Sequence, residues 1–179
     1  MKNIIFVPIK DYFISRKKVF IKFFIPMLVA LAAFLLAIFF NIGNSEKVLS
    51  AFSAFVDTQI NIAAILISFS VAIITILVSA DNKNIQRLKD TESNKKQYNP
   101  VNGKQLSLFQ ILLSNIAYNV IAEIIYLVAL TAISLMQNLL PIITLKYITA
   151  ICIFVILHIL FVLLESVAQM YLTFWANKK

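Results

Sequence analysis

The chain is poor in the residues that disulfides, metal centres and flexible backbones need. Among 179 residues it has one cysteine, one histidine and two glycines. The single thiol, Cys152, excludes an intramolecular disulfide and paired-thiol redox chemistry. One histidine falls short of the three or four ligands of a typical metal site, so we expect no metal and no other cofactor. Both glycines, Gly43 and Gly103, lie outside the long apolar runs, which argues against the broken midplane helices of inverted-repeat transporters.

Catalytic motifs are also missing. The sequence has no protease dyad in a recognisable form, no paired thiols and no Asp-rich or His-rich headgroup motif of lipid transferases. We therefore expect no catalytic residues and a protein that is not an enzyme.

What the chain does have is four long apolar runs, and hydrophobic residues make up 61% of it. Each run meets or exceeds the roughly 20 residues that a helix needs to cross a bilayer core of about 30 Å. We predict an all-α polytopic membrane protein with four transmembrane helices arranged as two antiparallel hairpins. The predicted spans are 23–41, 52–80, 107–136 and 142–174, which together form a transmembrane domain at 23–179 with a cytoplasmic loop at 81–106.

The basic residues indicate the orientation, because loops rich in Lys and Arg stay in the cytoplasm. Of the 16 Lys and Arg residues, 14 fall on the side that holds both termini, and only Lys47 and Lys146 fall on the other. Abundant Ile, Phe, Asn and Lys are typical of a bacterium with an AT-rich genome. We therefore expect a bacterial cytoplasmic (inner) membrane, both termini in the cytoplasm, and attraction to anionic headgroups. Direct binding of nucleic acid is a poorer account of the charge, because there is no folded basic domain to carry it.

Residues 1–22 mix large apolar side chains with lysines and an arginine, which is typical of a helix lying in the lipid interface. Pro8 fixes or shortens its first turn, so the regular part should begin near residue 9. We predict a cytoplasmic interfacial segment that precedes the first span.

The second span passes into charged residues without Gly or Pro, so we expect its helix to continue into the cytoplasm. It should break in the stretch that contains Asn99-Pro100 and Asn102-Gly103, which are turn-forming pairs. This region is either a partner-binding surface or a solvated linker. The basic residues expected to bind a cytoplasmic partner protein are Lys83, Arg87, Lys89, Lys95 and Lys96.

Polar residues inside the third and fourth spans fall at helical spacing, as one stripe on each helix. The stripes are Asn115, Asn119 and Glu123 on the third span, and His158, Glu165 and Gln169 on the fourth. Antiparallel counting from a turn near residue 140 places Glu123 beside His158 and Asn115 beside Glu165. Such pairs favour either a proton relay or an interhelical clamp, since polar side chains between spans stabilise their contact by about 0.6 to 2 kcal/mol each.

The second span carries a different row of small and polar residues, repeating at intervals of four and three. Its members are Asp57, Asn61, Ala64, Ser68, Val71, Thr75 and Ser79. Such a face permits close approach of another helix. It predicts either the lining of a pore in an oligomer, with Asp57 at the external mouth, or ordinary packing against the first or third span.

The stretch SFSVAIITILVSADNKNIQRLKD (68–90) runs from a small-polar span into a charged segment. With four spans and cytoplasmic termini, the chain resembles small membrane proteins of bacterial phage-defence operons, nearest to the membrane component of the Kiwa system, KwaA. The resemblance covers most of the chain and is one of architecture. It implies a homo-oligomeric inner-membrane sensor that detects phage assault and signals to a cytoplasmic effector, and it assigns no role to a residue.

The sequence thus leads to three functional hypotheses. The first is a membrane-embedded sensor or scaffold that docks another protein through its cytoplasmic face. The second is an oligomeric ion channel or depolarising pore. The third is an immunity or superinfection-exclusion protein that blocks an invader's membrane component.

Overall fold

The computed structural model describes residues 6–39, 45–79, 83–95, 97–101 and 103–175, and for residue 45 and residues 172–175 only the backbone. Within these residues the fold is all-α, and four helices are long and apolar enough to cross a membrane. The predicted polytopic all-α class is therefore confirmed. The elements are α1 (Val7–Ile14), α2 (Val19–Phe39), α3 (Ser45–Ser79), α4 (Lys83–Asp90), α5 (Leu108–Met136), the short 3₁₀ helix η1 (Gln137–Leu139) and α6 (Ile142–Trp175).

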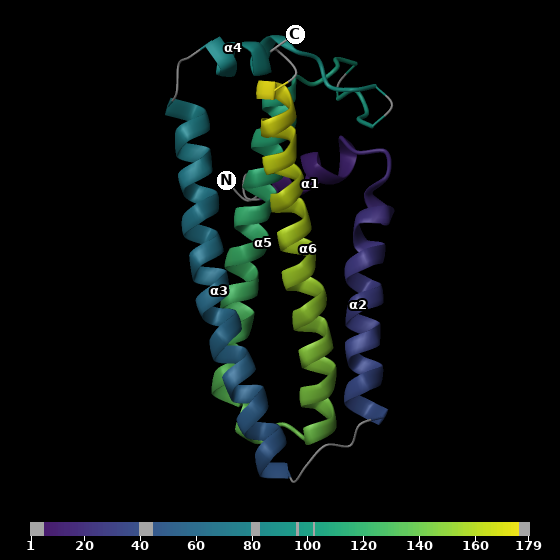
Figure 1. Ribbon diagram of the computed structural model, residues 1–179, viewed down its shortest axis with the longest axis vertical. Helices are drawn as coiled ribbons and strands as arrows, with labels where there is room; N and C mark the ends of the chain where they lie inside the picture. The colour runs from purple at the N-terminus through teal and green to yellow at the C-terminus, as the bar shows by residue number, and fades with distance from the viewer. Residues whose placement is uncertain (1–5, 40–44, 80–82, 96, 102, 176–179) are drawn as a thin grey trace.

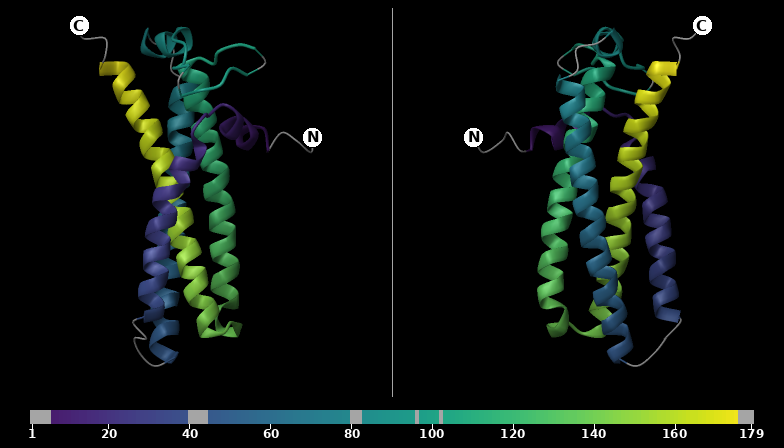
Figure 2. Two further views of the ribbon diagram at one scale, coloured as in Figure 1. Left: turned by 90° about the vertical axis from the view of Figure 1, so that its right-hand side faces the viewer. Right: turned by 60° about the vertical axis from the view of Figure 1, so that its left-hand side comes forward.

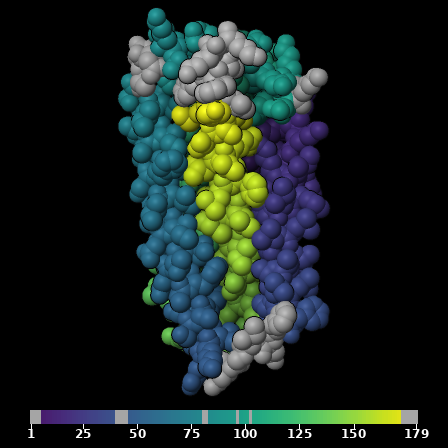
Figure 3. Space-filling view, viewed as in Figure 1, coloured from purple at the N-terminus to yellow at the C-terminus, as the bar shows by residue number. Residues whose placement is uncertain are grey.

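The four long helices run side by side (Figures 1 and 2). α5 packs against α3 and α6, while α2 packs mainly against α6. On the face shown in Figure 3, α6 lies between α3 and α2. α2 is the most peripheral of the four, since Pro26 and Ala30 are its only buried side chains among the described residues. A helix that is apolar all round and exposed on most of its surface suits a position against lipid.

Two apolar clusters hold α3, α5 and α6 together. One includes Phe52, Val56, Tyr126 and Ile159 near the end of the bundle that carries η1. The other lies near the opposite end, where Ile73 and Leu77 of α3 meet residues of α5 and α6. The face of α3 that packs against the bundle is therefore the one that carries its larger apolar residues.

Local signals set the ends of α5. Ser107 caps its start, because its Oγ accepts from the Gln110 backbone N–H at 3.2 Å while its own N–H donates to Gln110 Oε1 at 2.9 Å. This reciprocal capping box satisfies two amides that a helix start leaves free. At the far end, η1 and Pro141 lead directly into α6, which gives the predicted antiparallel hairpin.

Two helices are longer than the predicted spans. α2 begins at Val19 and α3 at Ser45, each several residues before its apolar run. Glu46 lies in the first turn of α3, where a carboxylate is favourable beside the helix dipole. Hydropathy therefore located the spans but not the first turns of these two helices.

The end of the bundle that carries α1, α4 and residues 91–107 also carries most of the basic residues, and we call it the basic end. The prediction that the second helix continues into the cytoplasm is wrong for the described residues, because α3 ends at Ser79 and α4 lies across the end of the bundle (Figure 1). Ile85 and Leu88 of α4 are buried against Leu77 and Leu112. Burial of these two side chains favours a separate helix folded over the bundle.

The described residues between 91 and 107 are folded rather than a free linker. Ser93 N–H donates to Leu106 O at 2.9 Å, and Gly103 adopts a φ of 78° in the turn between Val101 and Lys104. Only a residue without a Cβ takes this conformation readily. Asn102, the other half of the predicted turn pair, lies outside the described residues.

The same segment pairs with the linker between α1 and α2. Lys17 N–H donates to Gln97 O at 3.1 Å, and Asn99 N–H donates to Ser15 O at 2.8 Å. α1 itself lies across the bundle and packs on α5 (Figure 2). We call α1, residues 15–18, α4 and residues 91–107 together the cap.

Candidate functional site at the basic end

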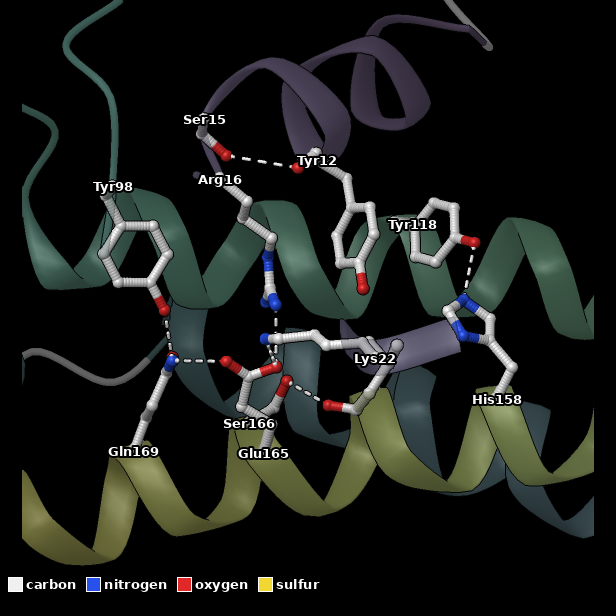
Figure 4. Close-up of polar contacts among 11 residues, drawn as sticks. Tyr12, Ser15, Arg16, Lys22, Tyr98, Tyr118, His158, Glu165, Ser166 and Gln169 are labelled. Carbon is white, nitrogen blue, oxygen red and sulfur yellow. Dashed lines mark hydrogen bonds and ion pairs between the residues drawn. The ribbon is translucent and has the colours of Figure 1, made fainter. Parts of the chain in front are cut away.

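Glu165 of α6 is the point where the cap meets the spans. Its Oε2 accepts from Arg16 Nη1 at 2.7 Å and also from Lys22 Nζ, while its Oε1 accepts from Gln169 Nε2 at 3.3 Å (Figure 4). Gln169 Nε2 in turn donates to the Tyr98 hydroxyl at 2.5 Å. Two neighbouring turns of α6 therefore hold the α1–α2 linker, the start of α2 and the 91–107 segment.

Arg16 is the buried member of this cluster. Its side chain is 2% exposed, and its guanidinium carbon lies 4.4 Å from the centre of the Tyr12 ring. Two of its nitrogens, Nε and Nη2, have no hydrogen-bond partner among the described residues. An arginine desolvated to this extent depends on its carboxylate partner, because a buried charge left alone costs several kcal/mol.

The two tyrosines beside Arg16 remain neutral. Burial raises the pKa of Tyr12 and of Tyr98, and the positive charge of Arg16 opposes this rise in both. Because an ordinary tyrosine already titrates near pH 10, both hydroxyls keep their protons at neutral pH. The cluster thus has one carboxylate, two cations and two neutral phenols.

His158 lies deeper in the bundle and does not contact Glu123. Its Nε2 is 2.9 Å from the Tyr118 hydroxyl, and its ring stacks on Phe23 of α2 with centroids 4.2 Å apart. Tyr118 also stacks on Tyr12 at 4.0 Å, so α1, α2, α5 and α6 all meet here. The predicted Glu123–His158 pair is therefore wrong.

Glu123 instead faces α3. Its Oε1 accepts from Ser70 Oγ at 3.0 Å and from Asn119 Nδ2 at 2.9 Å, and the residue is fully buried. The predicted Asn115–Glu165 pair is also wrong, since Glu165 binds the groups described above and Asn115 Nδ2 has no partner among the described residues. Asn115 and Asn119 are nevertheless both buried on the same stripe as Glu123.

The predicted pairs were wrong about the direction in which the side chains point around their helices, although the predicted depth of Glu123 and His158 along the bundle was close. Contacts between α5 and α6 join Tyr118 to His158 and Tyr126 to the Cys152 carbonyl, which places Glu123 within about one turn of His158. Tyr118 and Glu123 are five residues apart, however, and so point about 140° away from each other. When Tyr118 faces α6, Glu123 must face α3.

The small-polar row of α3 lies on the outside of the structure. Asp57, Asn61, Ser68 and Thr75 are all exposed, as are the other members of the row, so the prediction that it packs against the first or third span is wrong. The larger apolar residues of α3, such as Val56 and Leu77, are buried on the opposite face. Ser70 lies on that inward face as well, because it points about 160° away from Ser68, and it donates to Glu123.

The hydroxyls of this row bond within their own helix. Ser68 Oγ donates to Ala64 O and Thr75 Oγ1 to Val71 O, each at 3.0 Å. Asp57 and Asn61 have no such bond to other described residues. Both side chains are exposed, so water or a partner can meet their hydrogen-bonding groups.

Most of the predicted partner-binding residues are exposed on the cap. Lys83, Arg87 and Lys89 lie on α4 with exposed side chains, and Lys95 is exposed in the segment that follows. The Lys89 ammonium lies 5.3 Å from the Phe109 ring centre. Lys96 lies outside the described residues.

Sequence reasoning missed several residues of these clusters, among them Arg16, Lys22, Tyr98 and Ser70. Arg16 was counted only as a topological charge, although it directly precedes the first span and Glu165 lies near the same end of the last. Matching charges at equal distance from the basic end is a signal that could have found this pair. Ser70 offered no such signal, because serines are frequent along α3.

The described residues contain no group of three or more His, Cys, Asp or Glu side chains that could hold a metal ion. No protein-family model, curated protein or solved structure matches the chain. Function therefore has to be argued from the geometry of the cap and the bundle.

Proposed function

We propose that the chain is a non-enzymatic sensor or scaffold of the bacterial inner membrane, with its basic end in the cytoplasm. It forms homo-oligomers and signals to a cytoplasmic partner protein, and its architecture resembles that of phage-defence membrane components. On this proposal the membrane spans receive the stimulus and the cap presents it to the partner.

The observation that carries the proposal is the convergence of cap segments on α6. Arg16 and Lys22 both pair with Glu165, and Gln169 one turn away holds Tyr98. A displacement or rotation of α6 would strain these contacts together, because ion pairs and hydrogen bonds of a buried cluster are short and directional. A change at membrane depth would thus reach segments that were far apart in the sequence.

The surface that a partner would meet is the outer side of α4. Its basic side chains are exposed while Ile85 and Leu88 anchor the helix to the bundle. An acidic partner surface would be attracted to them, since complementary charge directs encounter between proteins. The cap therefore offers a fixed, positively charged docking face.

Charge reversal tests the docking. The triple variant Lys83→Glu, Arg87→Glu, Lys89→Glu should abolish co-purification of the product of an adjacent gene while leaving thermal unfolding of the purified protein unchanged. The matched control reverses Lys47 and Lys146, which lie near the opposite end of the chain's spans, and should leave co-purification intact. Equal loss in both variants, or retention in the triple variant, would contradict the docking surface.

A second candidate function is an oligomeric ion pore, and the outward row of α3 favours it. A polar row facing away from its own bundle can be covered by the same row of neighbouring copies. Ion flux through the purified protein in liposomes at pH 5.5 and 7.5 tests this. Flux that disappears in Asp57→Asn or Asn61→Ala would establish the pore and displace the sensor, whereas absence of flux would exclude it.

A further inference from the structure

A pocket of about 460 Å³ opens beside the Glu165 cluster, between the α1–α2 linker, the start of α2, residues 97–98 and α6. It is lined by Arg16, Lys18, Ile21, Lys22, Gln97, Tyr98 and Glu165. Three of these side chains are cations and one is an anion. The pocket therefore carries a net formal charge of about +2, the difference between those groups, before any ligand is present.

The charge excess cannot be relieved by the protein groups that line the pocket. Glu165 already accepts from both Arg16 and Lys22 through the same oxygen. Arg16 is 5% exposed, and its Nε and Nη2 still lack partners within the described part of the chain. Buried donors of a charged group are costly when they lack acceptors, so the arrangement favours an added anion.

The hydrogen-bond donors of the pocket also indicate which kind of anion it would bind. Arginine presents a planar fork that matches the oxygens of a phosphate, and lysine ammonium groups add point charges beside it. Gln97 and Tyr98, two neutral polar residues, also line the pocket. A tetrahedral anion with several oxygens uses such a set better than a single carboxylate.

We propose that this pocket binds a phosphate group, carried either by an anionic lipid headgroup of the neighbouring leaflet or by a soluble phosphate ester. The site is formed by Arg16, Lys18 and Lys22 around the Glu165 carboxylate. The site does not depend on whether the cap docks a partner. A negative result for the site would therefore leave the proposed sensor function untouched, and the reverse also holds.

Calorimetric titration of the full chain in maltoside micelles tests the site and its source. The probes are inorganic phosphate, dioctanoyl phosphatidylglycerol, and dioctanoylglycerol, which lacks the phosphate. We expect binding by at least one phosphate probe and none by dioctanoylglycerol. Binding of phosphatidylglycerol alone identifies a lipid source, and binding of inorganic phosphate identifies a soluble one.

Two variants locate the binding. Lys18→Gln removes an exposed pocket cation, so it should fold normally and weaken Kd about tenfold, the effect of one charge-assisted contact. Lys10→Gln removes an equal charge from the exposed side of α1, outside the pocket, and should leave Kd within about twofold.

Three results would overturn the proposal. They are no binding by either phosphate probe, equal binding by dioctanoylglycerol, and equal weakening in Lys18→Gln and Lys10→Gln. The last would mean that general attraction to the basic end, rather than the pocket, holds the anion.

Discussion

Glu123 and Glu165, on the neighbouring helices α5 and α6, lie in contrasting surroundings. Glu123 is fully buried between α3 and α5, and among the described residues it accepts from the neutral groups of Ser70 and Asn119. Glu165 lies near the basic end and accepts from Arg16 and Lys22. The first joins two spans through neutral hydrogen bonds, whereas the second joins a span to the cap through charges. The same residue type therefore links two spans at one depth and links a span to the cap at another.

The largest effect is expected from Glu165→Gln. Removing the carboxylate leaves Arg16 buried without a counter-charge, which should lower the free energy of unfolding by about 3 kcal/mol. Unfolding in mixed micelles with increasing dodecyl sulfate, followed by circular dichroism, measures this. A loss no greater than that of Glu123→Gln would remove the distinction between the two sites.

Glu123→Gln should lower the free energy of unfolding by only about 1 kcal/mol. Ser70 and Asn119 can donate to an amide oxygen as they do to the carboxylate, so most of the contact survives. Ser70→Ala should cost a similar amount, and the two changes should be non-additive in a double-mutant cycle because they act on one contact. Additive losses would show that Ser70 and Glu123 act separately.

Tyr118→Phe should have a smaller effect, about 0.5 to 1 kcal/mol. It removes the hydroxyl that contacts His158 Nε2 but keeps the ring that stacks on Tyr12. The same unfolding titration measures it, with Tyr147→Phe as the matched control because Tyr147 is 51% exposed. Identical results for the two tyrosines would mean that the hydroxyl contact contributes nothing to stability.

Asn61→Leu should leave the stability of the monomer within about 0.5 kcal/mol, because exposed substitutions rarely do more. If the outward row of α3 joins copies of the chain, the same change should weaken self-association in sedimentation equilibrium. Ile76→Leu, at another exposed position of α3, is the control and should leave self-association unchanged. Unaltered association in Asn61→Leu would exclude this residue from an interface between copies.

The long apolar runs predicted the four spans, because a 30 Å hydrocarbon layer imposes a minimum length that composition reveals directly. It was harder to predict which neighbouring helix each side chain faces. Spacing placed Asn115, Asn119 and Glu123 on one stripe, but which neighbour that stripe faces depends on how three helices share their contacts. The stripe faces Ser70 of α3, and nothing in its local sequence distinguishes Ser70 from Ser68 or Ser79.

The cap shows a second kind of feature that the sequence could not predict. The turn signals near Gly103 were readable from the sequence, since only particular residues adopt a positive φ readily. The pairing of residues 15–17 with residues 97–99 was not, because backbone hydrogen bonds leave no trace in side-chain pattern. The pairing of Arg16 with Glu165, 149 positions away, joins two side chains and was missed because Arg16 was counted only as a topological charge.

The most direct test of coupling between α6 and the cap is hydrogen exchange in lipid nanodiscs. The amides of Lys17 and Asn99, which join the two cap segments, should exchange about a hundredfold faster in Glu165→Gln than in the unaltered chain. In Glu123→Gln they should be unchanged. Equal exchange in both variants would contradict the account, because the cap would then be held without the Glu165 contacts.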